Sequence, residues 1–331
     1  MSTISLPKII FGTSGLGNLY VAPDEADKLA IVRQCMLHAV TPAVFDTAGK
    51  YGAGLALESL GRCLAQLQVK PEEVLISNKL GWYRIPLSTA EPTFEPGVWK
   101  HLQFDAEQRI SYEGMLACFE QGNQLLNGYH ASLVSVHDPD EYLHGATNES
   151  DRKARFEHIK EAYQALFYLK KQGKVKAIGV GAKDWRTIRL ITQYIQLDWV
   201  MIANSMTLHS HPEHLLEYME ELKAQNIQII NSAVFNGGFL TGGDYYNYKL
   251  VSEDNPEHRK LLQWRKRFFE ICAQHNIPPA HACVQYGLNA PGVTSIALST
   301  SKAAKVKGNI ELATKKIAPS FWNALEAEEL I

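Results

Sequence analysis

The run Leu133-Val134-Ser135-Val136-His137 carries the strongest fold signal in this sequence. It is short and mostly apolar, and its residues do not alternate between apolar and polar. Ile227-Gln228-Ile229-Ile230 has the same character. A strand of this kind is buried on both faces, which is typical of a parallel sheet covered by helices. The sequence therefore predicts an α/β fold with parallel strands.

Similar short runs recur along the chain. The predicted strands are Lys8–Gly12, Ala43–Asp46, Val74–Lys79, Leu133–His137, Ala177–Gly181, Trp199–Ala203, Gln228–Ala233 and Thr294–Leu298. Segments with helical patterning lie between them and predict helices at Asp24–Ala39, Leu55–Leu67, Ser111–Leu126, Arg155–Gln172, Pro212–Gln225, Glu257–His275 and Pro279–Asn289. Such alternation gives either a doubly wound sheet or a closed barrel. Eight strands in one chain favour a (β/α)8 barrel with its active site at the C-terminal rim of the strands.

Composition sets limits on the class of protein. The chain is 46% hydrophobic and 21% charged, and no linker divides it, so residues 1–331 are predicted to form a single domain. A net charge of -2 argues against nucleic acid as a partner. Because the chain lacks a run of roughly 18 apolar residues, we expect no membrane span.

The N-terminus does not resemble a signal peptide. The five cysteines are widely spaced and predict a cytoplasmic protein without disulfides. The histidines at 209, 211 and 214 form a cluster, but no carboxylate or cysteine completes a metal site there and Pro212 marks a helix start. The sequence therefore predicts no bound metal.

Three consecutive predicted strands each end in an ionisable residue. Asp46 ends the second strand, Lys79 the third and His137 the fourth. Tyr51 lies in the glycine-flanked loop just after Asp46. Each residue alone would fit a structural role, such as a helix cap or a rim cation. Because barrel active sites draw on the ends of several strands, the four together predict a catalytic centre.

These four groups suit hydride transfer to or from a carbonyl carbon. Reduction of a carbonyl needs a proton donor, and oxidation of an alcohol needs a base. A tyrosine with a pKa of about 10 is a poor base at neutral pH, and a nearby ammonium lowers that pKa. The predicted roles are proton transfer by Tyr51, support by Lys79, positioning of that ammonium by Asp46, and orientation of the substrate oxygen by His137.

The joint motif resembles the aldo/keto reductase family. It consists of Asp46-Thr47-Ala48 followed by Tyr51-Gly52, then Glu58 and Gly61, then a strand-end lysine and a strand-end histidine. The resemblance covers essentially the whole chain. It implies a (β/α)8 barrel, a catalytic tetrad of Asp46, Tyr51, Lys79 and His137, and NAD or NADP as the cofactor.

Members of that family bind NAD(P) at the rim after the seventh and eighth strands, and this chain has no Rossmann glycine pattern. The resemblance implies cofactor contacts from Thr13, Asn204, Ser232, Phe235, Asn236, Gly237, Leu240, Ser299, Thr300, Ser301, Lys305 and Asn309. Hydroxyls and lysines at a helix start suit a phosphate, and Lys305 is compatible with either NAD or NADP. Where many members have Ser-Asn to hold the carboxamide, this chain has Gly181-Ala182-Lys183, so Asn204 is the candidate for that contact.

Three segments resemble one branch of the family, which contains D-threo-aldose 1-dehydrogenases (L-fucose dehydrogenases) and pyridoxal 4-dehydrogenases. They are Phe11–Tyr20, His137–Asp140 and Val234–Gly238. The resemblance implies oxidation of the anomeric carbon of an aldose, such as L-fucose, L-galactose or D-arabinose, to a lactone. The alternatives are a general aldehyde or ketone reductase, a pyridoxal dehydrogenase, and a nucleotide-sensing regulatory subunit on the same barrel.

Three residues are predicted to contact this small-molecule substrate. Trp82 and Tyr83 belong to a loop rich in aromatic and polar residues, which suits a sugar ring or a pyridine. Asp138 follows the catalytic histidine and can bond sugar hydroxyls. Two other roles stay open: the aromatic residues can pack the loop itself, and Asp138 can form the turn around Pro139.

Overall fold

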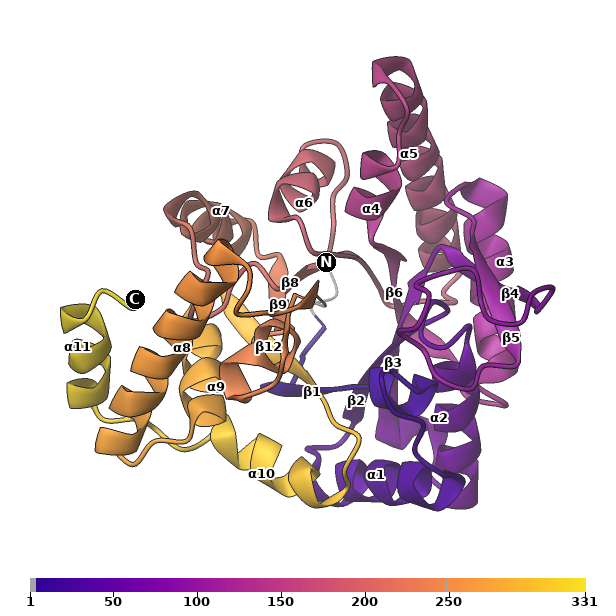
Figure 1. Cartoon of the computed structure of the whole chain (residues 1–331). Helices are drawn as coiled ribbons and strands as arrows, with labels where there is room; N and C mark the ends of the chain where they lie inside the picture. The colour runs from indigo at the N-terminus through magenta and orange to yellow at the C-terminus, as the bar shows by residue number, and fades with distance from the viewer. Residues whose placement is uncertain (1–3, 248) are drawn as a thin grey trace.

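Eight parallel strands close into a barrel in the computed structural model, which describes residues 4–247 and 249–331 (Figure 1). Residues 1–3 and 248 of the predicted domain lie outside the described residues. In their order around the barrel the strands are β1 (Ile9–Gly12), β12 (Val293–Ser299), β9 (Gln228–Ser232), β8 (Trp199–Ala203), β7 (Ala177–Ala182), β6 (Ala131–His137), β3 (Val74–Leu80) and β2 (Ala43–Ala48). Each corresponds to a predicted strand, with ends that differ by a residue or two at most, so the predicted barrel is confirmed.

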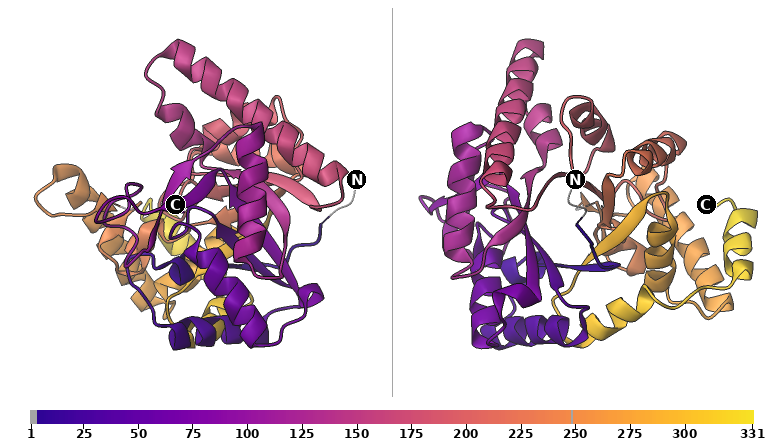
Figure 2. Two further views of the ribbon diagram at one scale, coloured as in Figure 1. Left: turned by 90° about the vertical axis from the view of Figure 1, so that its right-hand side faces the viewer. Right: turned by 180° about the vertical axis from the view of Figure 1, so that it is seen from behind.

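Helices surround the barrel. They are α1 (Glu25–His38), α2 (Leu55–Gln66), α3 (Tyr112–Leu125), α4 (Pro139–His144), α5 (Glu149–Lys171), α6 (Trp185–Thr192), α7 (Glu213–Ala224), α8 (Pro256–Gln274), α9 (Pro279–Asn289), α10 (Ala304–Leu312) and α11 (Pro319–Ala327). The sequence predicted α1, α2, α3, α5, α7, α8 and α9 but not the other four. Figure 2 shows α11, coloured yellow, on the outside of the ring, where it packs against α8.

Several predicted helix ends agree with the observed caps, but the predicted start of α5 at Arg155 was wrong: the helix begins at Glu149, because the Asn148 side chain caps it. The Asp24 carboxylate accepts a hydrogen bond from the backbone N–H of Asp27 and so caps α1 at 2.8 Å. Ser111 caps α3 in the same way. Gly173 follows α5 with a φ of 70°, a left-handed conformation that glycine adopts without strain. Among the described residues, every helix is too short or too polar to cross a bilayer.

Apolar side chains fill the barrel interior, so the cavity described below lies only at one end. Val44, Leu133, Trp199 and Ile230 are almost fully buried there, and the N-terminal segment packs against the same cluster. The wide Trp199 ring fits because β7 has Gly179 beside it, where a β-carbon would overlap the indole.

The other end of the barrel carries the long connections. The loop after β3 forms a hairpin of β4 (Trp82–Pro86) and β5 (Phe104–Gln108), and residues 87–103 connect these two strands. A short 3-10 helix, η1 (Ser14–Gly17), follows β1, and Leu19 just beyond it pairs with Trp99 of the hairpin connection. These segments give the C-terminal rim walls that rise above the strands.

Candidate active site

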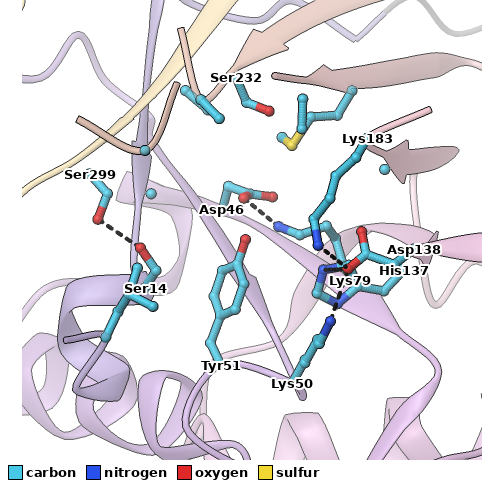
Figure 3. Close-up of a pocket in the computed structure, with 18 of the residues that line it drawn as sticks. Ser14, Asp46, Lys50, Tyr51, Lys79, His137, Asp138, Lys183, Ser232 and Ser299 are labelled. Atoms are coloured by element: carbon cyan, nitrogen blue, oxygen red, sulfur yellow. Dashed lines mark hydrogen bonds and ion pairs between the residues drawn. The ribbon is translucent and has the colours of Figure 1, made fainter. Parts of the chain in front are cut away.

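A cavity of about 300 Å³ opens at the C-terminal ends of the strands. Asp46 from β2, Lys79 from β3, His137 from β6 and Tyr51 from the loop after β2 all line it (Figure 3). The structure thus brings together the four residues predicted to be catalytic. They meet because neighbouring parallel strands end at the same rim.

Asp46 and Lys79 form a buried ion pair. The Lys79 Nζ lies 2.5 Å from Asp46 Oδ2, and the Ser77 hydroxyl donates to the other carboxylate oxygen at 3.2 Å. Both side chains are less than 5% exposed. Gly181 of β7 leaves the room that this needs, because a β-carbon there would stand 3.0 Å from the Lys79 Cδ. Burial of the Lys79 ammonium would be costly without a charged partner, and the Asp46 carboxylate supplies that partner.

The Tyr51 ring lies close to both this ion pair and His137. The Lys79 Nζ is 4.7 Å from the centroid of the Tyr51 ring, and the hydroxyl points toward the ion pair (Figure 3). The His137 ring meets the Tyr51 ring edge-on, with centroids 5.7 Å apart. Gly52, with a φ of 62°, fixes the loop against η1, where a β-carbon would overlap the Gly17 carbonyl. The phenol therefore lies beside the buried Lys79 ammonium.

His137 is held neutral. Burial lowers the pKa of its imidazole well below the ordinary value; Asp138 acts in the opposite direction, and the ammonium groups of Lys79, Lys50 and Lys183 lower the pKa further. Its Nδ1 has no hydrogen-bond partner among the described residues. A neutral imidazole carries one N–H and can donate it to an oxygen in the cavity.

This depressed pKa predicts a pH dependence of stability. In the unfolded chain the imidazole titrates near 6.5, whereas in the folded protein it binds a proton only at lower pH. Below pH 6.5 the unfolded state binds more protons than the folded state, so the free energy of unfolding decreases as the pH is lowered, by at most about 1.4 kcal/mol per pH unit. Urea unfolding between about pH 5 and 7.5 measures this slope. His137→Gln should reduce the slope, and an unchanged slope would assign it to other groups.

A second charged cluster, which the sequence analysis did not predict, forms the wall beside His137. The Lys50 Nζ lies 3.1 Å from Asp138 Oδ2, 2.8 Å from Glu141 Oε2 and 2.9 Å from Glu95 Oε1. Lys183 reaches the same group, with its Nζ 3.7 Å from Asp138 Oδ2 and an ion pair to Glu141. Burial opposes ionisation of Asp138, but the neighbouring positive groups hold its pKa below the usual range. Burial likewise opposes the charge on both lysines, and the carboxylates keep their pKa values above the ordinary one.

The opposite wall fits a dinucleotide. Ser232, Phe235, Gly237 and Ser299 line the cavity there, together with small or apolar floor residues. Gly237 and the following glycine have φ values of 75° and 97°, and a β-carbon on the second would contact nothing within 4 Å. Open backbone at such a turn lets a phosphate approach closely. The residues present therefore fit the NAD(P) that the resemblance implies.

Other predicted cofactor residues lie around this wall rather than on it. The Thr13 hydroxyl donates to the Asp46 carbonyl at 3.0 Å, Asn236 is buried and donates to the backbone of Asn204, and Leu240 lies in an apolar cluster. Asn204 lines a neighbouring rim cavity, and its amide oxygen has no partner among the described residues. Thr300 and Asn309 line a small pocket below the rim, while Ser301 and Lys305 are exposed near the start of α10.

The predicted substrate residues divide into two groups. Asp138 lines the cavity, whereas Trp82 and Tyr83 are not among the described residues that line it. The Lys50 ammonium lies over the Trp82 ring at 5.1 Å, and the Arg109 guanidinium lies over the Tyr83 ring at 3.9 Å. Both residues belong to the β4–β5 hairpin, and their rings pack against these charged side chains. The hairpin connection instead contributes Trp99, whose ring lies 5.8 Å from the Tyr51 ring.

The histidine cluster noted in the sequence packs against aromatic rings. His209 meets the Trp264 ring edge-on at 4.7 Å, and its Nδ1 is 2.9 Å from the Tyr246 hydroxyl. His211 packs edge-on against Tyr286. Within residues 4–247 and 249–331, no group of three or more His, Cys, Asp or Glu is arranged to hold a metal ion.

The closed parallel barrel with a cavity at its C-terminal rim is a (β/α)8 barrel, and its match to a known family identifies it as an oxidoreductase. The model of the aldo/keto reductase family matches residues 8–329, and the chain belongs to that family. Its members generally use NAD(P)H.

Two curated relatives resemble the chain over nearly its whole length. A pyridoxal 4-dehydrogenase from Microbacterium luteolum is 26% identical, over 97% of this chain and 93% of its own. A D-threo-aldose 1-dehydrogenase from a Pseudomonas species is 25% identical, over 99% of this chain and 95% of its own. Both belong to the branch that the sequence motifs indicated.

Solved structures share the fold at lower identity. A glycerol dehydrogenase from Gluconobacter oxydans superposes with a TM-score of 0.70 at 16% identity and covers 99% of this chain and 93% of its own. An aldo-keto reductase from Bacillus halodurans, in its holo form, gives 0.69 at 16% identity, over 97% and 91% of the two chains. These likenesses support the barrel.

Proposed function

We propose that the protein oxidises the anomeric carbon of a cyclic aldose to a lactone with NAD or NADP. The observation that carries this proposal is the position of Tyr51, whose ring lies 4.7 Å from the Lys79 ammonium in a cavity that Asp46 and His137 also line. Loss of a hydride from C1 makes the anomeric hydroxyl acidic, so a base must stand beside that hydroxyl.

Each residue of the tetrad has one task in this proposal. Tyr51 removes the proton of the anomeric hydroxyl. Lys79 stabilises the phenolate that does so, and Asp46 holds Lys79 in place through the 2.5 Å ion pair. His137, neutral in the folded protein, donates a hydrogen bond to the same substrate oxygen and orients it. When bound, NAD(P)+ supplies the acceptor for the hydride.

The two sides of the cavity suit the two ligands. The Trp99 ring and the Asp138 carboxylate offer a sugar one apolar face and one hydrogen-bond acceptor. We assign the nicotinamide end of the cofactor to the wall of Ser232, Phe235 and Ser299, and the pyrophosphate to the open backbone at Gly237. We assign a further phosphate to the start of α10, where the predicted contacts are Thr300, Ser301, Lys305 and Asn309.

A second candidate is oxidation of pyridoxal, which also forms a cyclic hemiacetal. It is favoured by the pyridoxal 4-dehydrogenase relative and by the flat Tyr51 and Trp99 rings, which lie 5.8 Å apart at the cavity wall. Oxidation at the hemiacetal carbon gives a lactone here too, so the same four residues would serve both substrates.

A substrate panel tests the proposal. Absorbance of the reduced nicotinamide is followed with L-fucose, L-galactose, D-arabinose and pyridoxal, with NAD+ and NADP+ in turn, and the product is identified by mass. We expect turnover of at least one sugar and a lactone product. Turnover of pyridoxal alone would favour the second candidate, and activity only as a reductase of simple aldehydes would indicate a general carbonyl reductase. Cofactor binding without turnover of any compound would indicate a regulatory subunit.

A further inference from the structure

An ion pair links the two segments that carry Tyr51 and His137. Lys50 directly precedes Tyr51, and Asp138 directly follows His137. The Lys50 Nζ lies 3.1 Å from Asp138 Oδ2, and Figure 3 shows the two side chains meeting beside the His137 ring. Each residue of this ion pair is therefore the chain neighbour of a proposed catalytic residue, and the rings of those two residues are in edge contact.

Lys50 is buried to an unusual degree for an ammonium. Its side chain is 3% exposed, and it has two further carboxylate partners, Glu141 at the start of α4 and Glu95 in the connection between β4 and β5. A charge in such a place costs free energy unless it is paired. Because its partners come from separate segments, one ammonium ties the Tyr51 loop, the end of β6 and the hairpin together.

The backbone of Asp138 is shaped for this contact. Its φ of 47° and ψ of 52° lie in the left-handed region, where a residue with a side chain is strained. Its backbone N–H donates to the Gly181 carbonyl at 2.9 Å, which helps to hold this conformation. Strain of this kind persists only where surrounding contacts offset it, and the pair with Lys50 is one such contact.

We propose that the Lys50–Asp138 ion pair is a positioning clamp, which fixes the distance between the Tyr51 hydroxyl and the His137 imidazole so that both reach one substrate oxygen. This inference rests on the proposed function. In this role Lys50 and Asp138 act on the reaction through Tyr51 and His137, and for Asp138 the role is additional to the hydrogen bond that its carboxylate offers a sugar. Proton transfer tolerates little misplacement, and a shift of about 1 Å can cost on the order of 100-fold in rate.

The clamp also sets the charge around His137. The charged groups that face this imidazole are Lys50 from the loop after β2, Lys79 from β3, Asp138 at the end of β6 and Lys183 at the end of β7. Removing the positive charge of Lys50 should raise the pKa of His137, and removing the negative charge of Asp138 should lower it. A residue that stabilised the fold from outside the cavity would produce neither shift, and the ring-to-ring contact distinguishes a positioning role from an electrostatic one.

The test uses the full-length protein with Lys50→Met, Asp138→Asn, the double variant and the conservative Lys50→Arg. Lys170→Met is the control. Lys170 also forms an ion pair, with its Nζ 2.6 Å from Asp198 Oδ2, but this pair does not line the cavity. For each protein kcat, KM for both ligands and the thermal midpoint are measured. NMR of labelled histidine, assigned with His137→Gln, gives the titration midpoint of His137 and the nuclear Overhauser contact between its ring and Tyr51.

We expect Lys50→Met to lower kcat by about 10- to 100-fold and to weaken the ring-to-ring contact, with the affinity for NAD(P) retained. The His137 midpoint should move up in this variant and down in Asp138→Asn. The double variant should lose no more activity than the worse single one, and Lys50→Arg should recover part of kcat. Lys170→Met should lower only the thermal midpoint.

The proposal is overturned if Lys50→Met keeps its kcat and ring-to-ring contact, or if its losses match those of Lys170→Met. If Lys50→Met does not fold, Lys50→Arg and Asp138→Asn decide the question by the same readouts. Should the wild type turn over no compound of the panel, the proposed function fails. The NMR measurements then still test the clamp, because they need no substrate.

Discussion

Tyr51→Phe should lower kcat by about 10²- to 10⁴-fold and leave the affinity for NAD(P) within about twofold. The substitution removes one oxygen atom, and in the proposed reaction that atom carries the proton. The phenyl ring keeps the packing of Tyr51 against Trp99 and His137, whose ring centroids lie 5.8 and 5.7 Å away. The fold should therefore be unchanged, and the loss should appear in kcat.

Tyr163→Phe is the matched control for this change. The Tyr163 hydroxyl is buried between α5 and the outer face of the barrel, where it donates to the Gly179 carbonyl at 3.2 Å, and it does not line the cavity. Its loss should cost about 1 kcal/mol of stability and leave kcat unchanged. Steady-state kinetics, cofactor titration by fluorescence and urea unfolding of both variants make the comparison. If Tyr51→Phe kept most of its activity, the proton would have to pass through another group.

The fold was predictable because the strands carry an unambiguous pattern. Residues such as Val134 and Val136 are buried on the outer side of the barrel, and Leu133 is buried inside it, so apolar residues occupy both faces. Four helices escaped prediction for reasons of length and signal. α4 and α6 span fewer than three turns, so they show little helical period. α10, of which only a start was expected, and α11 begin without a polar side-chain cap.

Some residues of the candidate site were predictable from the sequence and others were not. Asp46, Lys79 and His137 were predictable because they end strands, and the ends of neighbouring parallel strands must lie together. The charged cluster was not predictable, because Lys50 and Lys183 lie in loops whose side-chain directions depend on tertiary contacts with Asp138 and its neighbours. Tyr83 is a further example: its aromatic character suggested a substrate contact, and nothing in the sequence indicated that the Arg109 guanidinium lies over its ring.

Lys79→Met should damage both stability and activity. Asp46 would keep its carboxylate at 3% exposure, with the Ser77 hydroxyl as one remaining partner and no ammonium at 2.5 Å. An uncompensated buried charge of this kind costs about 3–5 kcal/mol of folding free energy. The rate should also fall by at least about 100-fold, because the phenolate of Tyr51 loses its neighbouring positive charge.

The double variant Asp46→Asn/Lys79→Met separates these two effects. It removes both charges, so most of the lost folding free energy should return, while kcat stays as low as in Lys79→Met. Urea unfolding and single-turnover kinetics on the two variants and on Asp46→Asn complete the cycle. Activity that returned together with stability would mean that Lys79 serves only to neutralise Asp46. If stability returns but activity does not, the loss of activity cannot be due to poor folding. Lys79 would then act on Tyr51 during the reaction.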